Sequence, residues 1–120
     1  MAEPDAGRVL VCRIGSERVA LPVTAVRQVV ASFPLTRIPG TAPAIRGLAN
    51  VQGTLVTAIS GAALLGQRAS DRSDWLVVLS LCSGRVGLEV DEVEDVHDRT
   101  PATPRTLELE TLLRPLLAET

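Results

Sequence analysis

The strongest candidates for a catalytic or cation-binding site, by residue type and spacing, are four carboxylates within residues 91–95. Such a cluster can supply a general acid and base, or the oxygen ligands of a cation. Its members are Asp91, Glu92, Glu94 and Asp95, and they flank regularly spaced valines. Charged side chains beside buried valines are typical of a strand at the border of a sheet. We therefore interpret the cluster as the solvated face of an edge strand.

No other combination of residues forms a recognisable catalytic motif. His97 is the single histidine and has no serine or cysteine nucleophile near it in a known pattern, so we expect a surface residue. Gly61 and Gly66 have the spacing of a phosphate-binding loop, but Gln67 and Arg68 stand where that loop needs Lys and Ser or Thr. The sequence predicts a protein without enzymatic activity, metal or cofactor. Turnover of a small substrate by the purified chain would contradict this prediction.

The two cysteines, Cys12 and Cys82, lie in or beside apolar runs. They do not have the spacing of metal ligands. A disulfide between them would need an oxidising compartment, for which nothing in the sequence argues. We expect two small buried thiols.

The composition predicts a soluble globular chain with an aliphatic core. Hydrophobic residues make up 46% of the chain and aromatic residues only 2%, so packing among aliphatic side chains must supply the stability. A net charge of −2 with few aromatic side chains disfavours a nucleic-acid surface. The longest weakly polar stretch, residues 55–66, is shorter than the roughly 20 residues that cross a bilayer. Because the chain also starts with acidic residues rather than a signal peptide, we expect a cytoplasmic protein.

The elements that position these residues come from an internal duplication. Residues 16–30 recur 67 positions later as residues 83–97, with seven of fifteen positions identical. The identical pairs are Ser16/Ser83, Arg18/Arg85, Val19/Val86, Leu21/Leu88, Val23/Val90, Val26/Val93 and Val29/Val96. The first apolar residues of each copy alternate with period 2 and predict a half-buried strand. The later valines are spaced by three, which suits a bend or a helical turn before the strand resumes.

A second apolar run precedes each copy across a short turn, at residues 9–14 and 75–81. Each half therefore predicts a hairpin with a Gly-containing turn. We expect two related β-modules packed side by side.

The remaining segments predict short elements. Residues 1–7 are interpreted as a disordered polar leader and residues 8–120 as a single domain. A Pro/Gly loop precedes two short strands, and a helical turn at residues 61–65 should end at Gly66. After a Pro/Thr loop, six leucines from Leu107 to Leu117 are spaced for an amphipathic helix, which Pro115 should kink or end.

The middle segment reads Pro39-Gly40, then Ile45-Arg-Gly-Leu-Ala-Asn-Val-Gln-Gly53, an apolar strand and a helical turn that ends near Gly66. With this pattern it resembles the CheW-like domain of bacterial chemotaxis adaptors. That family shows a Pro-Gly loop, the pattern V-R-G-L-x-N-x-R-G, an apolar strand and a short helix ending near Gly. The chain matches it at residues 39–40 and 45–53. The first hairpin and Val86-Gly-Leu-x-Val-Asp-x-Val93 in the second are also similar, so the resemblance covers about residues 9–96.

The resemblance implies an all-β fold of two small SH3-like barrels with a hydrophobic groove between them, and no enzymatic activity. It implies two partners, the cytoplasmic tip of methyl-accepting chemoreceptors and the regulatory domain of a CheA-type histidine kinase, within chemoreceptor arrays. Carried over residue by residue, the receptor-binding groove should include Val26, Val29, Gly47, Asn50, Trp75, Leu76 and Gly87. An exposed Trp75 would be a natural binding anchor. The alternative is that Trp75 is a core residue at the start of a strand.

Two substitutions depart from the family pattern near this groove. Gln28 and Gln52 stand where the family usually has Glu and Arg, which can form a salt bridge. Because two amides can keep a hydrogen bond without a charge, joint replacement is consistent with a maintained contact; coincidental drift at two surface sites is the alternative. Ser60 stands where the family usually has Asp, with an effect that the sequence leaves open.

A further departure from the family pattern is the shortened C-terminal segment, residues 98–120. The family continues here with another Gly-led hairpin and a closing strand, so one barrel is expected to be incomplete, with an open edge that the leucine-rich segment covers. If that segment does not fold back, it should mediate self-association. Because the family contacts the kinase through both barrels, we predict an adaptor that binds receptor tips and modulates signalling with weakened or lost kinase contact. The alternatives are a conventional coupling protein that bridges receptor and kinase, and a self-associating scaffold.

Overall fold

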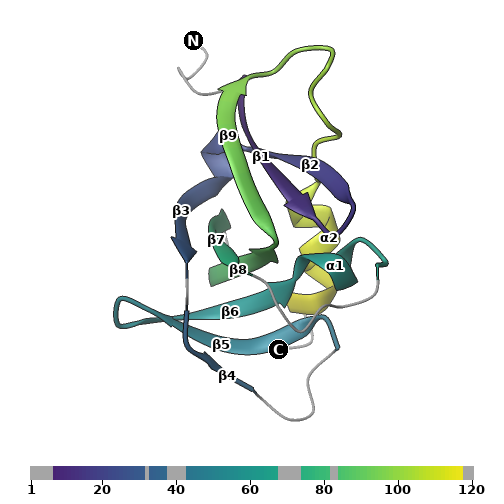
Figure 1. The fold of residues 1–120 in the computed structure, drawn as a ribbon. Coiled ribbons are helices and arrows are strands. Elements are labelled where there is room, and N and C mark those ends of the chain that lie inside the picture. Colours follow the sequence, from purple (N-terminus) through teal and green to yellow (C-terminus); the bar gives the residue numbers. More distant parts are fainter. Residues whose placement is uncertain (1–6, 32, 38–42, 68–73, 82–83, 118–120) are drawn as a thin grey trace.

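The computed structural model describes residues 7–31, 33–37, 43–67, 74–81 and 84–117. Its strands form a three-stranded and a six-stranded sheet, and its helices are few and short, which confirms the all-β class (Figure 1). The elements are β1 Arg8–Ile14, β2 Glu17–Pro22, η1 Val23–Ala25, β3 Val26–Ala31, β4 Leu35–Thr36, β5 Ile45–Val51, β6 Thr54–Ser60, α1 Gly61–Leu64, β7 Trp75–Leu81, β8 Gly84–Val90, β9 Glu92–Asp98 and α2 Leu109–Leu117. Among the described residues no helix is long and apolar enough to cross a membrane. The predicted polar leader, apart from Gly7, lies outside the described residues.

Both predicted hairpins are present, β1–β2 and β7–β8. The first turns at Gly15, whose φ of +60° is a conformation that glycine adopts without strain. The valines spaced by three mark the expected change of direction in each copy. In the first copy the 3-10 helix η1 separates β2 from β3, and in the second a bend at Asp91 separates β8 from β9.

The third strand of each copy pairs with the first strand of the other copy. β9 pairs with β1, and β3 pairs with β7, both antiparallel. The registers are equivalent under the shift of 67 residues, since Leu10 lies opposite Val96 and Val77 opposite Val29. Each pairing also contains one irregularity in register. The duplicated units are therefore intertwined, which is a closer relation than two modules packed side by side.

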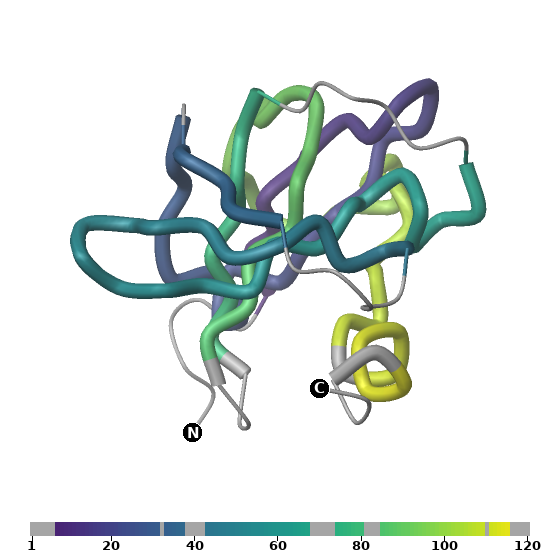
Figure 2. Tube along the Cα trace, turned by 90° about the horizontal axis from the view of Figure 1, so that it is seen from below, coloured from purple at the N-terminus to yellow at the C-terminus, as the bar shows by residue number. Residues whose placement is uncertain are grey.

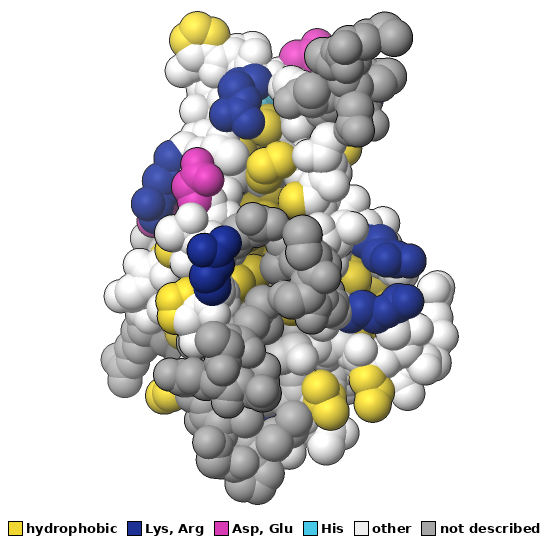
Figure 3. All heavy atoms as spheres, turned by 180° about the vertical axis from the view of Figure 1, so that it is seen from behind, with side chains coloured by type: hydrophobic (Ala, Val, Ile, Leu, Met, Phe, Trp, Pro, Cys, Tyr) yellow, Lys and Arg dark blue, Asp and Glu magenta, His cyan; other side chains and the backbone are white. Residues whose placement is uncertain are grey.

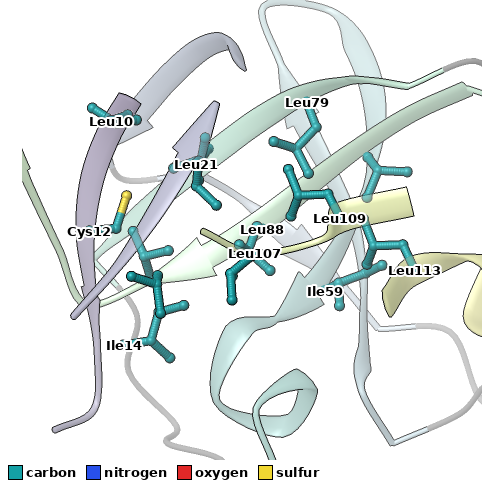
Figure 4. Close-up of a cluster of buried hydrophobic side chains, with 14 residues drawn as sticks. Leu10, Cys12, Ile14, Leu21, Ile59, Leu79, Leu88, Leu107, Leu109 and Leu113 are labelled. Atoms are coloured by element: carbon teal, nitrogen blue, oxygen red, sulfur yellow. The ribbon is translucent and has the colours of Figure 1, made fainter. Parts of the chain in front are cut away.

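The main core lies between the two copies and uses equivalent positions of both (Figure 4). Leu10, Cys12 and Leu21 come from the first hairpin, and Val77, Leu79 and Leu88 are their counterparts 67 positions later. All six are 5% exposed or less. The period-2 alternation thus directs the same face of each hairpin toward the other copy. Burial of these branched side chains is the main source of stability, at about 1.5–3 kcal/mol for each.

A second core cluster lies on the other face of the six-stranded sheet. Its buried members are Ala49, Val51, Val56, Ala58, Leu76 and Val78, with Val30, Phe33 and Leu35 packed against them. Because successive side chains of a strand point to opposite faces, β6 and β7 contribute to both clusters. The central strands are therefore buried on both faces, which exceeds the half-buried environment predicted from alternation.

The leucine-rich segment folds back onto the first hairpin, as expected for a cover. The Ala20 amide donates to the Arg105 carbonyl at 2.9 Å, and the Leu107 amide donates to the Ala20 carbonyl at 3.0 Å. These bonds form a parallel bridge between Ala20 and Thr106 on the free edge of β2. Leu107, Leu109 and Leu113 then enter the main core, and helix α2 continues past Pro115 to Leu117. Pro115 does not end the helix, because its missing donor removes a bond only in the last turn.

This segment occupies in the first copy the place that β6 occupies in the second. β6 runs parallel to β8 and places Ala58 opposite Gly87, the residue 67 positions after Ala20. Helix α1 follows β6 as α2 follows the bridge at Thr106. Residues 99–104 form no strand, so this stretch holds no counterpart of β4 and β5 for the first copy.

Candidate functional site

Three carboxylates of the acidic cluster lie on the edge strand β9, as predicted, and Asp91 lies in the bend just before it. Glu92 lies 3.3 Å from Arg13 and Glu94 lies 2.8 Å from Arg18, in ion pairs on the outer face of the three-stranded sheet. The Asp91 carboxylate accepts a hydrogen bond from the Gly15 amide in the first hairpin turn. Among the described residues, no group of three His, Cys, Asp or Glu side chains is arranged to hold a metal ion. The cluster has a structural role, because it joins β9 to the strands beside it.

The other residues considered for chemistry also have structural roles. Gly66 has a φ of +74° and ends helix α1, while the Gln67 side chain donates to the Ile14 carbonyl at 3.0 Å. His97 is partly exposed on β9, and its Nδ1 lies 3.1 Å from the Asp98 carbonyl. Cys12 is a fully buried free thiol, as expected. Cys82 lies outside the described residues.

Three of the predicted groove residues meet at one border of the six-stranded sheet. Val26 and Val29 lie on the edge strand β3, are partly exposed and pack against the main core. Trp75 starts β7, pairs with Ala31 of β3 and has the same mixed environment. Trp75 is therefore neither wholly exposed nor wholly a core residue, and one part of its indole surface remains open to a partner.

The other predicted groove residues are either buried within the sheet or lie on strands farther from β3. Leu76 is fully buried in the second core cluster, and a Cβ on Gly87 would lie 2.7 Å from its Cδ1 atom. Gly47 is buried, has a φ of +142° and leaves no room for a Cβ against the Thr36 carbonyl. Asn50 is exposed, and its Oδ1 accepts a hydrogen bond of 2.9 Å from the Gly53 amide in the β5–β6 turn. Leu76, Gly47 and Gly87 thus have packing roles, and Gly47 lies on β5 toward the opposite border of the sheet from β3.

Gln28 and Gln52 line one hollow of about 220 Å³ beside the tip of the β5–β6 hairpin. The hollow, which we call the Arg27/Arg85 hollow, is lined by Arg27, Gln28, Val51, Gln52, Thr54, Val56, Val78 and Arg85. Gln52 has a φ of +52°, which side chains other than glycine adopt mainly in tight turns. The fold brings the two amides to the same site, although no hydrogen bond joins them among those found for the described residues. The predicted proximity is therefore present, and a direct contact stays a prediction.

A buried ion pair lies on the second-core face of the same sheet. Arg46 Nε of β5 and Glu89 Oε1 of β8 are 3.1 Å apart, with side chains only 16% and 4% exposed. Within the described part of the chain, neither atom has a well-aligned hydrogen bond. Burial raises the pKa of the Glu89 carboxyl, and the Arg46 charge opposes this rise. Alternation alone did not reveal this pair, because Glu89 occupies the face of β8 that was expected to be solvated.

The sequence profile of the CheW-like domain matches residues 8–115. The chain belongs to the CheW-like domain family. Among solved structures it is similar to the crystal structure of the scaffolding protein TtCheW from Thermoanaerobacter tengcongensis, with a TM-score of 0.71 and 23% sequence identity. The match covers 80% of this chain and 67% of that chain, and it shows that the fold is shared.

Members of the CheW-like family are adaptors and scaffolds of chemotaxis signalling and have no enzymatic activity, and this general role extends to the present chain. The fold also explains one departure from the CheW-like pattern. The Ser60 hydroxyl accepts a hydrogen bond of 3.2 Å from the Ala63 amide and caps helix α1. Since Ser and Asp are both strong N-cap residues, Ser60 can replace the usual Asp without loss of the cap.

Sequence reasoning missed two features of the CheW-like surface. Arg27 and Arg85 were not singled out, because they become neighbours only when β3 and β8 enter one sheet. Leu55 on the β5–β6 hairpin is 61% exposed, more than any other large apolar side chain of the described residues. The break in polar and apolar alternation at Leu55 was the one local signal for it.

Proposed function

We propose that this chain is a chemosensory adaptor that binds the cytoplasmic tip of methyl-accepting chemoreceptors and modulates signalling to a CheA-type histidine kinase. The observation that supports receptor binding best is the border formed by Val26, Val29 and Trp75. Each side chain is partly exposed although it packs against the core. A row of half-exposed apolar residues on an edge strand suits an apolar helix face of a partner. The adaptor would then be located in the cytoplasm, at chemoreceptor arrays.

We further propose that the kinase contact is weakened. The family contacts the kinase through both halves of the fold, and the first half differs from the second here. Its β6-like segment follows β9 without a counterpart of β4 and β5, and helix α2 packs directly behind it. A kinase surface shaped for those strands would lose part of its contact area.

The test is a calorimetric titration of the purified chain against a receptor tip fragment and, separately, against the kinase regulatory domain. Binding to the receptor without binding to the kinase supports the proposal. Binding to both identifies a conventional coupling protein, and binding to neither refutes the receptor adaptor.

The duplication supplies a matched control for the receptor site. Val29→Ser on β3 should weaken receptor binding, whereas Val96→Ser, at the equivalent position on β9, should leave it unchanged. Equal effects of the two variants would show that the β3 border is not the binding surface.

Self-association is a second candidate function, favoured by one observation. β9 pairs on one side with β1, and its other edge has no strand beside it among the described residues. An open edge is a template for pairing with a second chain. Sedimentation of the chain alone tests this function, because a self-associating scaffold must show a mass that rises with concentration.

A further inference from the structure

The Arg27/Arg85 hollow carries positive charge that no carboxylate of the described residues balances. Arg27 and Arg85 are both exposed at its rim, its floor is apolar and its other polar side chains are uncharged. In Figure 3, basic side chains lie on either side of an apolar patch at one edge of the molecule. Among the described residues, neither Arg27 nor Arg85 has an ion-pair partner. By contrast, Arg13, Arg18, Arg46 and Arg105 are each paired with a carboxylate.

In the first copy of the duplication the equivalent arginine has a carboxylate partner, which the second copy lacks. Arg18, the counterpart of Arg85, holds Glu94 through one edge of its guanidinium group: Nε donates to the two carboxylate oxygens at 3.2 and 3.0 Å, and Nη2 donates at 2.8 Å. Glu94 lies 67 positions after Arg27. The second copy therefore keeps the arginine of this pair and replaces its carboxylate with another arginine.

We propose that the Arg27/Arg85 hollow binds a carboxylate side chain, Asp or Glu, of a partner protein at the place that corresponds to Glu94 in the first copy. Arginine suits this role because its planar guanidinium can hold a carboxylate with two hydrogen bonds. The amides of Gln28 and Gln52 can accept or donate to the partner backbone next to that side chain. That the partner is a receptor tip rests on the proposed function. That the bound group is a carboxylate follows from the two arginines and is independent of the proposed function.

The size and charge of the molecule favour an acidic protein segment over a nucleic acid. A hollow of about 220 Å³ admits one or two side chains and is small for a nucleotide. The chain carries a net charge of −2, and the outer face of β9 is acidic, so a polyanion would be repelled beyond the hollow.

The first experiment is the variant Arg27→Glu, which rebuilds within the second copy the pair seen in the first. The new glutamate should pair with Arg85 and raise Tm by about 2 °C. It should also occupy and repel the site of the partner carboxylate, so Kd for the receptor tip fragment should rise about tenfold or more. Arg114→Glu is the matched control, because Arg114 is an exposed arginine that does not line the hollow. It belongs to helix α2, which lies far from the tip of the β5–β6 hairpin (Figure 2). Arg114→Glu should leave Kd unchanged.

If Arg27→Glu has a higher Tm and a weaker affinity for the receptor tip fragment, the proposal is supported, because a general folding defect would lower both the Tm and the affinity. If Arg27→Glu binds the receptor tip fragment with the wild-type Kd, the proposal is overturned, while the adaptor function remains intact.

A second experiment decides the carboxylate chemistry without a receptor. The blocked peptide acetyl-Val-Glu-Val-amide and its Gln counterpart are titrated into the ¹⁵N-labelled chain, and the side-chain Nε–H signals of Arg27 and Arg85 are followed by NMR. Shifts with the Glu peptide alone support the proposal, even if the receptor fragment fails to bind and the proposed function is lost. Equal shifts with both peptides, or no shift with either, overturn it.

Discussion

At the scale of single residues, Glu89 is the most deeply buried charged side chain of the described residues. Its strand is buried on both faces, and its single cationic partner, Arg46, comes from two strands away across β6. Ionised groups lose hydration when they are buried, and the partner charge offsets only part of that loss. The pair should therefore specify how β5 and β8 are arranged more than it stabilises them.

Removal of Arg46 alone should be severe. Arg46→Met leaves the Glu89 carboxylate buried without a partner and should lower the free energy of unfolding by about 3 kcal/mol. The double variant Arg46→Met, Glu89→Leu should recover most of this loss, because it leaves no buried charge. Urea unfolding of wild type, both single variants and the double variant measures the coupling. Additive changes would show that the two side chains do not interact.

The raised pKa of Glu89 also predicts how stability depends on pH. The folded state binds the Glu89 proton more tightly than the unfolded state, in which the pKa is near 4.5. The contribution of Glu89 to stability is thus fully present below pH 4.5 and is lost as the pH rises through the folded pKa. The difference in free energy of unfolding between wild type and Glu89→Gln should fall over that range. A difference that is constant with pH would contradict the prediction.

Cys12 should be unreactive in the folded protein. Burial, with a smaller effect of the Glu94 charge, raises the pKa of its thiol to about 12, so almost no thiolate forms at neutral pH. In a Cys82→Ser background, a thiol reagent should label Cys12 only when urea unfolds the chain. Rapid labelling under native conditions would show that the first hairpin opens readily.

At the scale of elements, helix α2 and the bridge before it complete the first copy. The bridge satisfies backbone groups on the edge of β2, and the leucines of the segment fill the main core. The position taken by Ile59 of β6 in the second copy is taken by Leu107 in the first, and both are core residues. The helix is therefore part of the domain and should not behave as a detachable tail.

Leu113 tests this conclusion directly. It is fully buried, and Leu113→Ala should lower the free energy of unfolding by about 2–5 kcal/mol through lost contacts and a cavity. Leu112→Ala, on the same helix but only partly buried, should cost less. Urea unfolding compares them. If Leu113→Ala were as mild as Leu112→Ala, α2 would not pack on the core in solution.

At the scale of the whole molecule, the exchange of third strands makes the two halves interdependent. Each half contributes one strand to a sheet of the other half: β3 pairs with β7, and β9 pairs with β1. Neither half can bury its core alone, because the main cluster is built from equivalent faces of both hairpins. Unfolding should therefore be a single cooperative transition.

Two fragments test this interdependence. Residues 7–67 and 74–117, produced separately, should each lack stable β structure by circular dichroism. When expressed together they should elute as one complex whose spectrum resembles that of the intact chain. An independently folded fragment would show that the halves are separate modules.

The sequence by itself determined the local elements, because their signals are carried by neighbouring residues. Period-2 alternation marked the hairpins, the change to a spacing of three marked η1 and the bend at Asp91, and Gly66 marked the end of α1. The family pattern added the order of β5, β6 and α1 and the shared location of Gln28 and Gln52.

Only the tertiary structure decided which strands pair across the duplication. The local pattern of β3 is satisfied equally by a partner in its own copy or in the other, so the choice depends on the packing of the whole core. The same holds for Glu89, whose place in an alternating strand suggests solvent until a second cluster covers that face. The meeting of Arg27 and Arg85 likewise depends on β7 lying between their strands, a neighbourhood that no spacing along the chain encodes.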